Sequence, residues 1–224
     1  MFFFLAIAFF LFSHAGGTPD SDARRIADRT ERKIEARVRV LDQYLEKARE
    51  TDAYGLMDLN DIPDDMVIYK YVNDSLQSWC NQFSIINDDI SARLVFQRLT
   101  DQKSTIVSPL SEVSEDLSYM NLGPKWYIVK SVDIQNGVRI IAGIEILNTL
   151  IEGQHRTENG VNPVLNLPRR YSIVPLSISN GSEVSIQGKP LFKIADMDDV
   201  GGSLFDYYIL SKQIINREFE TTFL

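Results

Sequence analysis

The stretch Gly123–Leu147, which reads GPKWYIVKSVDIQNGVRIIAGIEIL, contains two β-rich runs on either side of the pair Asn136-Gly137. Asn-Gly readily takes positive φ at both central positions of a type I′ turn, and the twist of that turn matches the twist of the strands it joins. The stretch therefore predicts a β-hairpin. Its second arm is apolar on both faces apart from Arg139 and Glu145, which is typical of a strand in the middle of a sheet.

Two further segments are predicted to form paired strands. Met66–Trp79 begins with a run of β-branched and aromatic residues that stops at the turn-forming pair Asn73-Asp74, which favours a second hairpin. Periodicity alone does not exclude a helix here, with an apolar side formed by Tyr69, Val72, Leu76 and Trp79. Tyr171–Ser179 and Glu183–Ile194, joined by Asn180-Gly181, predict a third hairpin or a pair of short strands.

Residues 21–51 are predicted to form one long amphipathic helix, because apolar or small side chains recur at intervals of three or four residues. These positions are Ile26, Thr30, Ile34, Val38, Leu41, Leu45 and Ala48. The resulting seam is narrow enough to pair with a second copy of itself, as in a dimer stalk. The other faces carry arginines among acidic residues, which is typical of a solvated surface; a site for an anionic partner is the alternative.

Two shorter helices are predicted between the hairpins, one capped by Asn87 and running to Leu99, the other starting at Ser108-Pro109 and running to Met120. The polar stretch Thr149–Arg170 is long enough to be a functional loop. The order of elements predicts an α+β fold with a mainly antiparallel sheet of about five or six strands. A chain of 224 residues with 44% apolar side chains can bury a core in one such domain.

Composition argues against several functional classes. The formal net charge of −8 argues against nucleic-acid binding, which relies on Lys and Arg at phosphates. Cys80 is the only cysteine, so an internal disulfide or a zinc site of several thiolates is not expected, and a buried structural role is favoured over a reactive thiol. The two histidines, His14 and His155, have no partners for a catalytic triad or a metal set, and Asp196–Gly201 lacks the ligand spacing of a calcium loop. No catalytic residue, metal or cofactor is predicted.

The first twelve residues, Met1–Phe12, form an unbroken apolar run as long as the core of a signal peptide and shorter than the roughly 20 residues that span a bilayer. The run predicts export or anchoring, with the N-terminal segment at the inner membrane and the bulk of the chain in the periplasm. Arg24 and Arg25 follow the run and no basic residue precedes it, a bias that opposes this orientation. A basic segment upstream of Met1 would remove the conflict.

These features together resemble the extracytoplasmic sensor region of membrane-bound two-component histidine kinases, particularly hybrid kinases of the Bacteroides type. The resemblance rests on the apolar segment, the charged helix after it and three motifs, which are Tyr71–Leu76 with Trp79, Gly123–Tyr127 and Gly188–Phe192. It covers roughly residues 1–195. The family implies a PAS-like or Cache-like fold, and it divides the chain into an export signal or anchor (1–17), a stalk helix (18–52), a sensor domain (53–200) and a C-terminal segment without an assigned role (201–224).

The resemblance also implies a function. The chain would be the homodimeric, signal-sensing input region of a kinase, and it would pass a signal along its long helix. The signal would be a small molecule or a protein, and enzymatic activity would lie in the kinase rather than in this chain. A self-standing exported protein for ligand binding or interaction is the alternative.

PAS-like sensors commonly hold a small molecule against one face of the sheet. An aromatic wall with a charged side chain would suit a small anionic or sugar-like ligand, and the predicted ligand-binding residues are Tyr69, Tyr71, Trp126, Tyr127, Arg139 and Arg169. Packing of these rings beneath helices is the alternative. Cache sensors often read Arg-x-Trp-Tyr in this region, with the Arg holding a ligand carboxylate; Gly123 or Pro124 stands at that place here, so this contact is not carried over.

Overall fold

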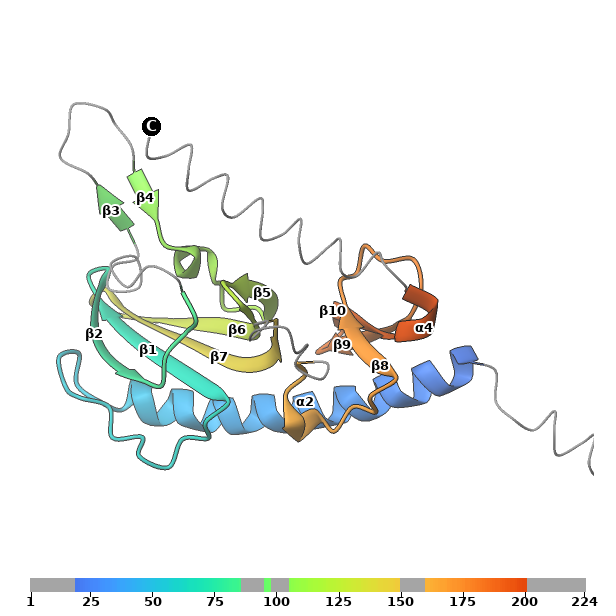
Figure 1. Ribbon diagram of the computed structural model, residues 1–224. Coiled ribbons are helices and arrows are strands. Elements are labelled where there is room, and N and C mark those ends of the chain that lie inside the picture. The colour runs from blue at the N-terminus through green and yellow to red at the C-terminus, as the bar shows by residue number, and fades with distance from the viewer. Residues whose placement is uncertain (1–18, 86–94, 98–104, 150–159, 201–224) are drawn as a thin grey trace, which may run out of the picture.

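The computed structural model describes residues 19–85, 95–97, 105–149 and 160–200. Figure 1 shows a long helix that runs along one side of the molecule, with two β-sheets lying one after the other along it. The helix is α2 (Pro19–Arg49), which has 31 residues and confirms the helix predicted for residues 21–51. The fold is α+β with mainly antiparallel sheets, as predicted.

The larger sheet has five strands in the order β2-β1-β7-β6-β5, and all its pairings are antiparallel. Its strands are β1 (Met66–Val72), β2 (Ser75–Cys80), β5 (Ser118–Leu122), β6 (Lys125–Ile134) and β7 (Val138–Asn148). β7 lies at the centre, as its apolar pattern predicts. Asn136 and Gly137, between β6 and β7, have φ values of 69° and 70°, so the predicted hairpin is confirmed, with positive φ at both residues of this pair.

Met66–Trp79 forms the predicted hairpin of β1 and β2, and the competing helix is wrong. The turn is Asn73-Asp74, with φ values of 48° and 62°. Asn and Asp enter this left-handed region more readily than other residues with a side chain, because their short polar groups can hydrogen-bond locally. The turn chemistry therefore decides between the two interpretations that periodicity left open.

The first of the two shorter predicted helices is absent from the part of it that the structure describes, residues 95–97. Val95–Gln97 is a strand, β3, which pairs with β4 (Thr105–Val107) in a separate two-stranded sheet. The remainder of the predicted helix, from Asn87 to Leu94 and at Leu99, lies outside the described residues. The partner that makes 95–97 a strand is eight or more residues away along the chain, so the local pattern does not reveal it.

The second shorter helix begins as predicted but ends after one turn. Ser108 is its cap, and its Oγ accepts a hydrogen bond from the backbone N–H of Leu110. The helical turn, η1, covers only Pro109–Glu112. Ser118–Leu122 is instead the edge strand β5, because Gly123, at a φ of 76°, reverses the chain and places β5 against β6.

The smaller sheet has three antiparallel strands in the order β8-β10-β9. They are β8 (Tyr171–Val174), β9 (Ser182–Ile186) and β10 (Lys189–Asp196), and the short helix α4 (Met197–Val200) follows. The region is β, as predicted, but the hairpin turn is Gln187-Gly188, with φ values of 53° and 78°, rather than Asn180-Gly181. β8 pairs with β10 and not with β9, so these strands form their own sheet and do not widen the larger one.

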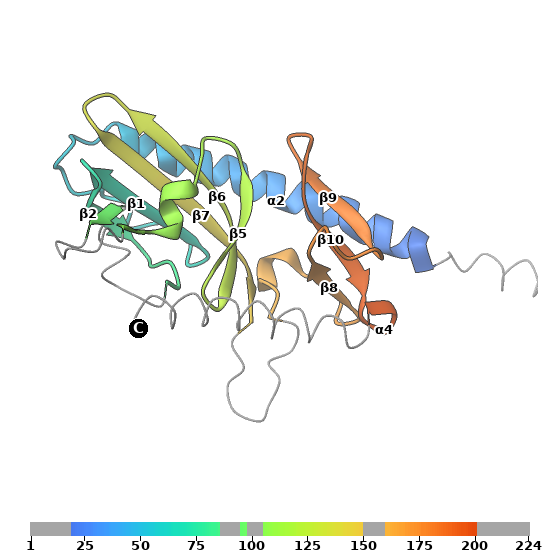
Figure 2. The same ribbon diagram turned by 90° about the horizontal axis from the view of Figure 1, so that it is seen from above.

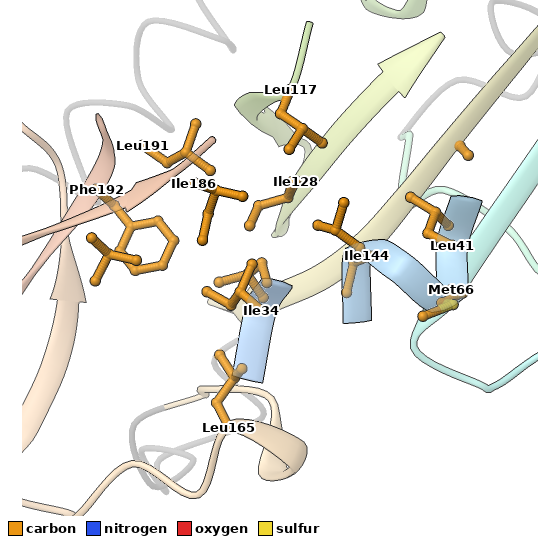
Figure 3. Packing of buried hydrophobic residues seen from close by; sticks show 14 of the residues in the cluster. Ile34, Leu41, Met66, Leu117, Ile128, Ile144, Leu165, Ile186, Leu191 and Phe192 are labelled. Carbon is orange, nitrogen blue, oxygen red and sulfur yellow. The ribbon is translucent and has the colours of Figure 1, made fainter. Parts of the chain in front are cut away.

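One face of α2 is buried beneath both sheets, with the smaller sheet over the first half of the helix and the larger sheet over the second half (Figure 2). The predicted seam lies in one apolar cluster with both sheets, shown in part in Figure 3; its members include Ile34, Leu41, Met66, Ile128, Ile144, Ile186 and Phe192. Ile34 and Leu41 are both 0% exposed. The seam predicted to pair with a second copy is therefore covered within the chain. A homodimer stays a prediction and would need another surface.

An aromatic contact joins the two sheets. The ring of Tyr119 in β5 stacks on Trp126 in β6 with centroids 4.9 Å apart, and it meets Phe192 of β10 at a centroid distance of 5.0 Å. Because the three rings come from both sheets, movement of one sheet against the other has to break this contact.

A polar contact joins the larger sheet to α2 and to the turn η2 (Pro163–Leu165). Asn162 caps η2, and its Nδ2 donates to Asp65 Oδ2 at 2.9 Å and to the carbonyl oxygen of Glu145 at 2.7 Å. Asp65 also forms an ion pair with Arg37 of α2. One carboxylate therefore ties the start of β1 to the helix and to the chain that leads into the smaller sheet.

Among the described helices, none combines the length and the hydropathy that crossing a membrane requires. The predicted export segment Met1–Phe12, residues 150–159 of the predicted loop and residues 201–224 lie outside the described residues.

Candidate functional site

The face of the larger sheet that points away from α2 carries four of the six predicted ligand-binding residues. Successive side chains of a strand point to opposite faces, so Ile68 of β1 packs towards α2 while Tyr69 and Tyr71 pack on the other side. Tyr127 of β6 lies in the same cluster as these two tyrosines. Arg139 of β7 is on this face too, because it pairs directly with Tyr71.

Trp126 and Arg169 are placed elsewhere. Trp126 precedes Tyr127 on β6 and therefore points to the α2 side of the sheet, where its ring stacks on Tyr119. Arg169 is exposed in the segment before β8. The structure thus brings together Tyr69, Tyr71, Tyr127 and Arg139 and separates the other two residues from them. Ligand binding by any of the six stays a prediction.

Phe83, in the segment that follows β2, fills the middle of this aromatic face. Its ring meets Tyr69 edge-on with centroids 5.0 Å apart and meets Tyr127 in the same way at 5.1 Å. Below the ring lies Gly143 of β7, where a Cβ atom would come within 2.6 Å of Phe83 Cε1. We call the group of Phe83, Tyr69, Tyr127 and Gly143 the Phe83 cage. Phe83 is only 5% exposed, so the chain itself occupies the centre of the predicted aromatic wall.

The tyrosine hydroxyls of the cage hold the backbone that carries Phe83. Tyr69 Oη accepts a hydrogen bond from the N–H of Phe83 at 3.2 Å, and Tyr127 Oη accepts one from the N–H of Ser84 at 3.2 Å. Tyr127 Oη also shares a hydrogen bond with Ser84 Oγ at 3.2 Å. Burial raises the pKa of Tyr127 above its ordinary value, and burial raises the pKa of Tyr71 as well. Both phenols are therefore neutral near pH 7 and suit hydrogen bonding rather than proton transfer.

Arg139 supplies positive charge to this face, but its guanidinium has partners within the chain. It donates a hydrogen bond to the carbonyl oxygen of Val113, and its Nε lies 3.4 Å from Asp133 Oδ1. Ser131 Oγ donates to the same carbonyl oxygen at 3.1 Å. The Arg139 side chain is 26% exposed. An anionic ligand would have to compete with Asp133 for this guanidinium.

The turn η1 covers the remaining part of the face. Leu110 of η1 and Val113 after it are buried in the same cluster as Tyr71. Tyr69, Tyr71 and Tyr127 are each at most 3% exposed, which agrees with packing of the aromatic wall beneath other elements. A ligand therefore reaches these rings only if residues 83–85 or η1 move.

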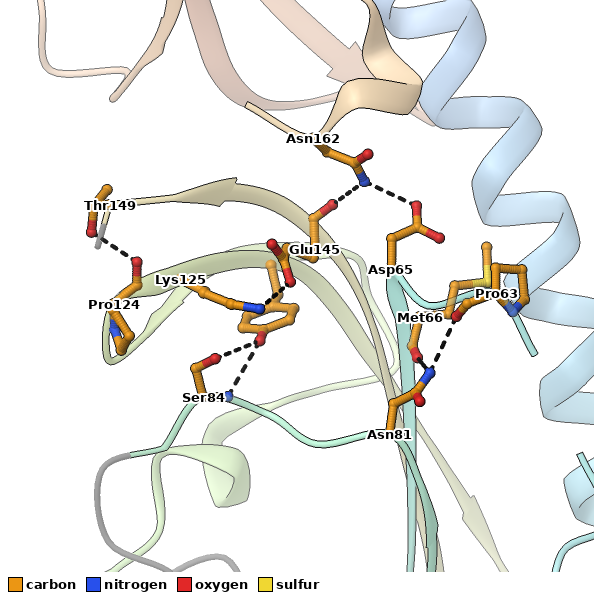
Figure 4. Close-up of polar contacts among 11 residues, drawn as sticks. Pro63, Asp65, Met66, Asn81, Ser84, Pro124, Lys125, Glu145, Thr149 and Asn162 are labelled. Atoms are coloured by element: carbon orange, nitrogen blue, oxygen red, sulfur yellow. Dashed lines mark hydrogen bonds and ion pairs between the residues drawn. The ribbon is translucent and has the colours of Figure 1, made fainter. Parts of the chain in front are cut away.

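Polar contacts at the edge of the face anchor the segments around the cage (Figure 4). Lys125 Nζ and Glu145 Oε2 are 2.6 Å apart and form a partly buried ion pair between β6 and β7. Asn81 Nδ2 donates to the carbonyl oxygens of Met66 at 2.7 Å and Pro63 at 3.2 Å. The chain that leaves β2 is therefore fixed at Asn81, two residues before Phe83.

Sequence reasoning missed Phe83, Ser84 and Gly143 as members of this site. Gly143 offered a signal, because a glycine within an otherwise apolar strand marks a place where another group approaches closely. Phe83 and Ser84 follow β2 without any local pattern that shows which face of the sheet they cover.

The described residues contain no group of three or more His, Cys, Asp or Glu side chains placed to hold a metal ion. Cys80 is partly buried, and burial raises the pKa of its thiol, so a reactive thiolate is not favoured. Asp196, from the stretch compared with a calcium loop, forms an ion pair with Arg170, whose Nε lies 2.5 Å from Asp196 Oδ2. His155 lies outside the described residues.

Comparison of the chain with models of known protein families, with curated proteins and with solved structures finds no match. The function is therefore inferred from the residues and contacts of this chain.

Proposed function

We propose that this chain is the extracytoplasmic signal-sensing region of a membrane-bound two-component histidine kinase, with a PAS-like or Cache-like sensor domain. The observation that supports this best is that a single helix, α2, packs against both sheets. A shift of either sheet therefore changes the contacts of the same helix, α2. In the sequence α2 is also the element nearest to the apolar run Met1–Phe12, so it is suited to carry a signal towards a membrane.

Strand β1 connects the Phe83 cage to α2. Tyr69 and Tyr71 belong to the aromatic face, whereas Lys70 between them points to the α2 side and is 0% exposed. The ammonium of Lys70 donates to the carbonyl oxygens of Thr51 and Asp52, just after α2 ends. A displacement of β1 at the cage would therefore pull on the C-terminal end of α2. This contiguous set of contacts is the route that we propose for the signal.

A small ligand with an aromatic or sugar-like body and a negative charge fits the chemistry of this face. Tyrosine rings provide stacking surfaces, and a guanidinium pairs well with a carboxylate. Such a ligand would displace the Phe83 ring from its place over Gly143, and its negative charge would replace Asp133 as the partner of Arg139. Binding and the release of residues 83–85 would then be one event.

A self-standing exported binding or interaction protein is the second candidate function. Among the described residues, three large hydrophobic side chains are more than half exposed and suit contact with another protein: Tyr54 by 72%, Leu56 by 79% and Trp79 by 52%. The gene sequence around this chain separates the two candidates. A continuous downstream reading frame with a phosphoacceptor histidine motif and an ATP-binding domain supports the sensor, whereas a stop codon and a secreted product support the alternative.

Placement outside the inner membrane is tested by fusing residues 1–60 to alkaline phosphatase and, separately, to a reporter that works only in the cytoplasm. The sensor proposal expects phosphatase activity. Activity from the cytoplasmic reporter alone would overturn the periplasmic placement, and with it both candidate functions.

Ligand capture is tested by a thermal-shift screen of the purified chain against organic acids, amino acids and oligosaccharides. A ligand of the aromatic face should lose its shift in Arg139→Ala and in Tyr127→Phe, and should keep it in Arg169→Ala, a matched loss of charge outside this face. Shifts that survive the first two substitutions would place the binding site elsewhere.

A further inference from the structure

The face of α2 that points away from both sheets carries a line of arginines. Five exposed arginines lie between residues 24 and 39 of α2, namely Arg24, Arg25, Arg29, Arg32 and Arg39. Arg25, Arg32 and Arg39 follow one another at intervals of seven residues, which correspond to a rise of about 10 Å each and a drift of only about 20° around the helix. We call these three residues the arginine line. All three side chains are exposed, whereas the two sheets pack on the buried face of α2.

Few of these charges are neutralised at the surface. Arg25 pairs with Asp22, and Arg32 Nε donates to the carbonyl oxygen of Asp28 at 3.1 Å. Among the described residues, Arg24, Arg29 and Arg39 form no ion pair. The cations on the inner side of the helix differ, because Arg37 pairs with Asp65 and Lys33 donates to the carbonyl oxygen of Leu165 at 2.6 Å. From residue 24 to residue 39 the exposed charged side chains are therefore these five arginines and Asp28, which leaves this face with a net positive charge.

The exposed surface of α2 becomes mixed in charge beyond Arg39. Its exposed residues there are Gln43, Glu46, Lys47, Arg49 and Glu50, and both cations are within ion-pair distance of a carboxylate, Lys47 of Asp61 and Arg49 of Glu46. Helix stability explains Lys47 and Arg49 in the last turn but not the arginines near the N-terminus, because the macrodipole favours acidic side chains near the N-terminus and basic ones near the C-terminus. Arg25 and Arg29, four residues apart, also repel each other. In a chain with a net charge of −8, such a concentration of arginines calls for an anionic partner.

We propose that the arginine line docks α2 on the anionic headgroups of a phospholipid membrane. A guanidinium binds a phosphate through two parallel hydrogen bonds, and a straight row of three suits a flat array of phosphates. The apolar run Met1–Phe12 ends seven residues before Pro19, where α2 begins, so the basic half of the helix is the half nearest to it. An apolar segment together with a basic patch is the combination that gives stable membrane attachment. Lipid binding by this face is independent of the proposed sensing role.

A second copy of the chain fits this face less well. In a parallel pair along the arginine line, each arginine would lie beside the same arginine of the other copy, and like charges at such short range repel. The membrane surface has no such penalty.

The test uses the full chain and vesicles of phosphatidylcholine with or without phosphatidylglycerol, and measures co-sedimentation. The variant R25Q/R32Q/R39Q should bind the anionic vesicles at least about tenfold more weakly than the unchanged chain at low salt, since each arginine near such a surface contributes about a factor of five. Binding to pure phosphatidylcholine should not change, because the apolar segment is indifferent to headgroup charge. About 0.5 M salt should remove the difference between the variant and the unchanged chain.

Two controls keep the result specific. K47Q/R49Q/K189Q removes the same charge from exposed positions outside the line and should bind as the unchanged chain does. R25K/R32K/R39K keeps the charge and should retain most of the binding. Equal binding by the glutamine variant and the unchanged chain, or an equal loss in the control, would overturn lipid docking. A third outcome would also overturn it: the glutamine variant differs from the unchanged chain in oligomeric state without lipid, yet binds vesicles equally well. That outcome would assign the arginine line to contact with a second copy.

Discussion

The ring of Phe83 lies directly over Gly143, so closely that a Cβ on this glycine would come within 2.6 Å of Phe83 Cε1. Gly143 stands in the central strand β7, where most neighbouring residues are larger and apolar. The missing side chain makes room for a ring from a segment sixty residues earlier in the chain. Tyr69 and Tyr127 complete the enclosure from β1 and β6.

Replacing Gly143 by Ala should lower the free energy of unfolding by about 1–3 kcal/mol, because the new methyl group overlaps the Phe83 ring and approaches Val129 Cγ1, at 3.3 Å. Urea unfolding followed by tryptophan fluorescence measures the loss. In Gly143→Ala with Phe83→Leu, the smaller side chain relieves the overlap, so the loss should be less than the sum of the two single losses. Additive losses would mean that the two residues are not in contact.

Replacing Asp65 by Ala should lower the free energy of unfolding by about 2–4 kcal/mol. Arg37 and Asn162 both lose a partner, and the Arg37 and Asp65 side chains are only 19% and 15% exposed. Asp61→Ala is the matched control. Its partner Lys47 Nζ is 3.5 Å away, both side chains are more than half exposed, and the expected loss is below about 1 kcal/mol. Equal losses in the two variants would contradict a structural role for Asp65.

Stability should fall at alkaline pH because of the buried tyrosines. Burial raises the pKa of Tyr71 and Tyr127, so above pH 10 the unfolded chain releases these protons while the folded chain keeps them. The free energy of unfolding should therefore fall by about 1.4 kcal/mol per pH unit for each tyrosine. Tyr71→Phe with Tyr127→Phe should remove this part of the slope.

Lys70 acts in the opposite direction over a lower pH range. Burial lowers the pKa of Lys70 in the folded chain, so the folded chain releases this proton at a lower pH than the unfolded chain does. The free energy of unfolding therefore rises with pH in this range, up to the ordinary lysine pKa of about 10.5. Urea titrations above about pH 10.5 therefore isolate the tyrosine effect. An unchanged slope in the double phenylalanine variant would show that the two phenols ionise in the folded state.

Replacing Leu41 by Asp should unfold the chain rather than dissociate a dimer. Leu41 is 0% exposed beneath the larger sheet, and a buried unpaired carboxylate should lower the free energy of unfolding by at least about 3 kcal/mol. Gln43→Asp, on the exposed face of the same helix, should change it by less than about 0.5 kcal/mol. Thermal melting of both variants checks this. A folded Leu41→Asp monomer would instead support the seam as a contact between copies.

Local chemistry was enough to determine the turns and the long helix. Asn136-Gly137 and Asn73-Asp74 reverse the chain as predicted, because the backbone preference of two residues suffices for a tight turn. The three-four spacing determined α2, because an apolar stripe of that period makes one continuous face only on a helix. The apolar pattern of β7 likewise determined its central place, since a strand without a polar face has to be covered on both sides.

Only the tertiary structure decided what covers each apolar surface. The apolar stripe of α2 could pack against a second helix or against a sheet, and its sequence pattern does not distinguish the two. The sheets of the same chain cover it, because the covalent connection keeps them at a high local concentration. Ser118–Leu122 has helical spacing, yet it is a strand because Gly123 folds it onto β6. The place of Phe83 over Gly143 depends on how the chain returns across β7 after β2. Such a contact is made between residues distant in the sequence, so no local periodicity or turn residue encodes it.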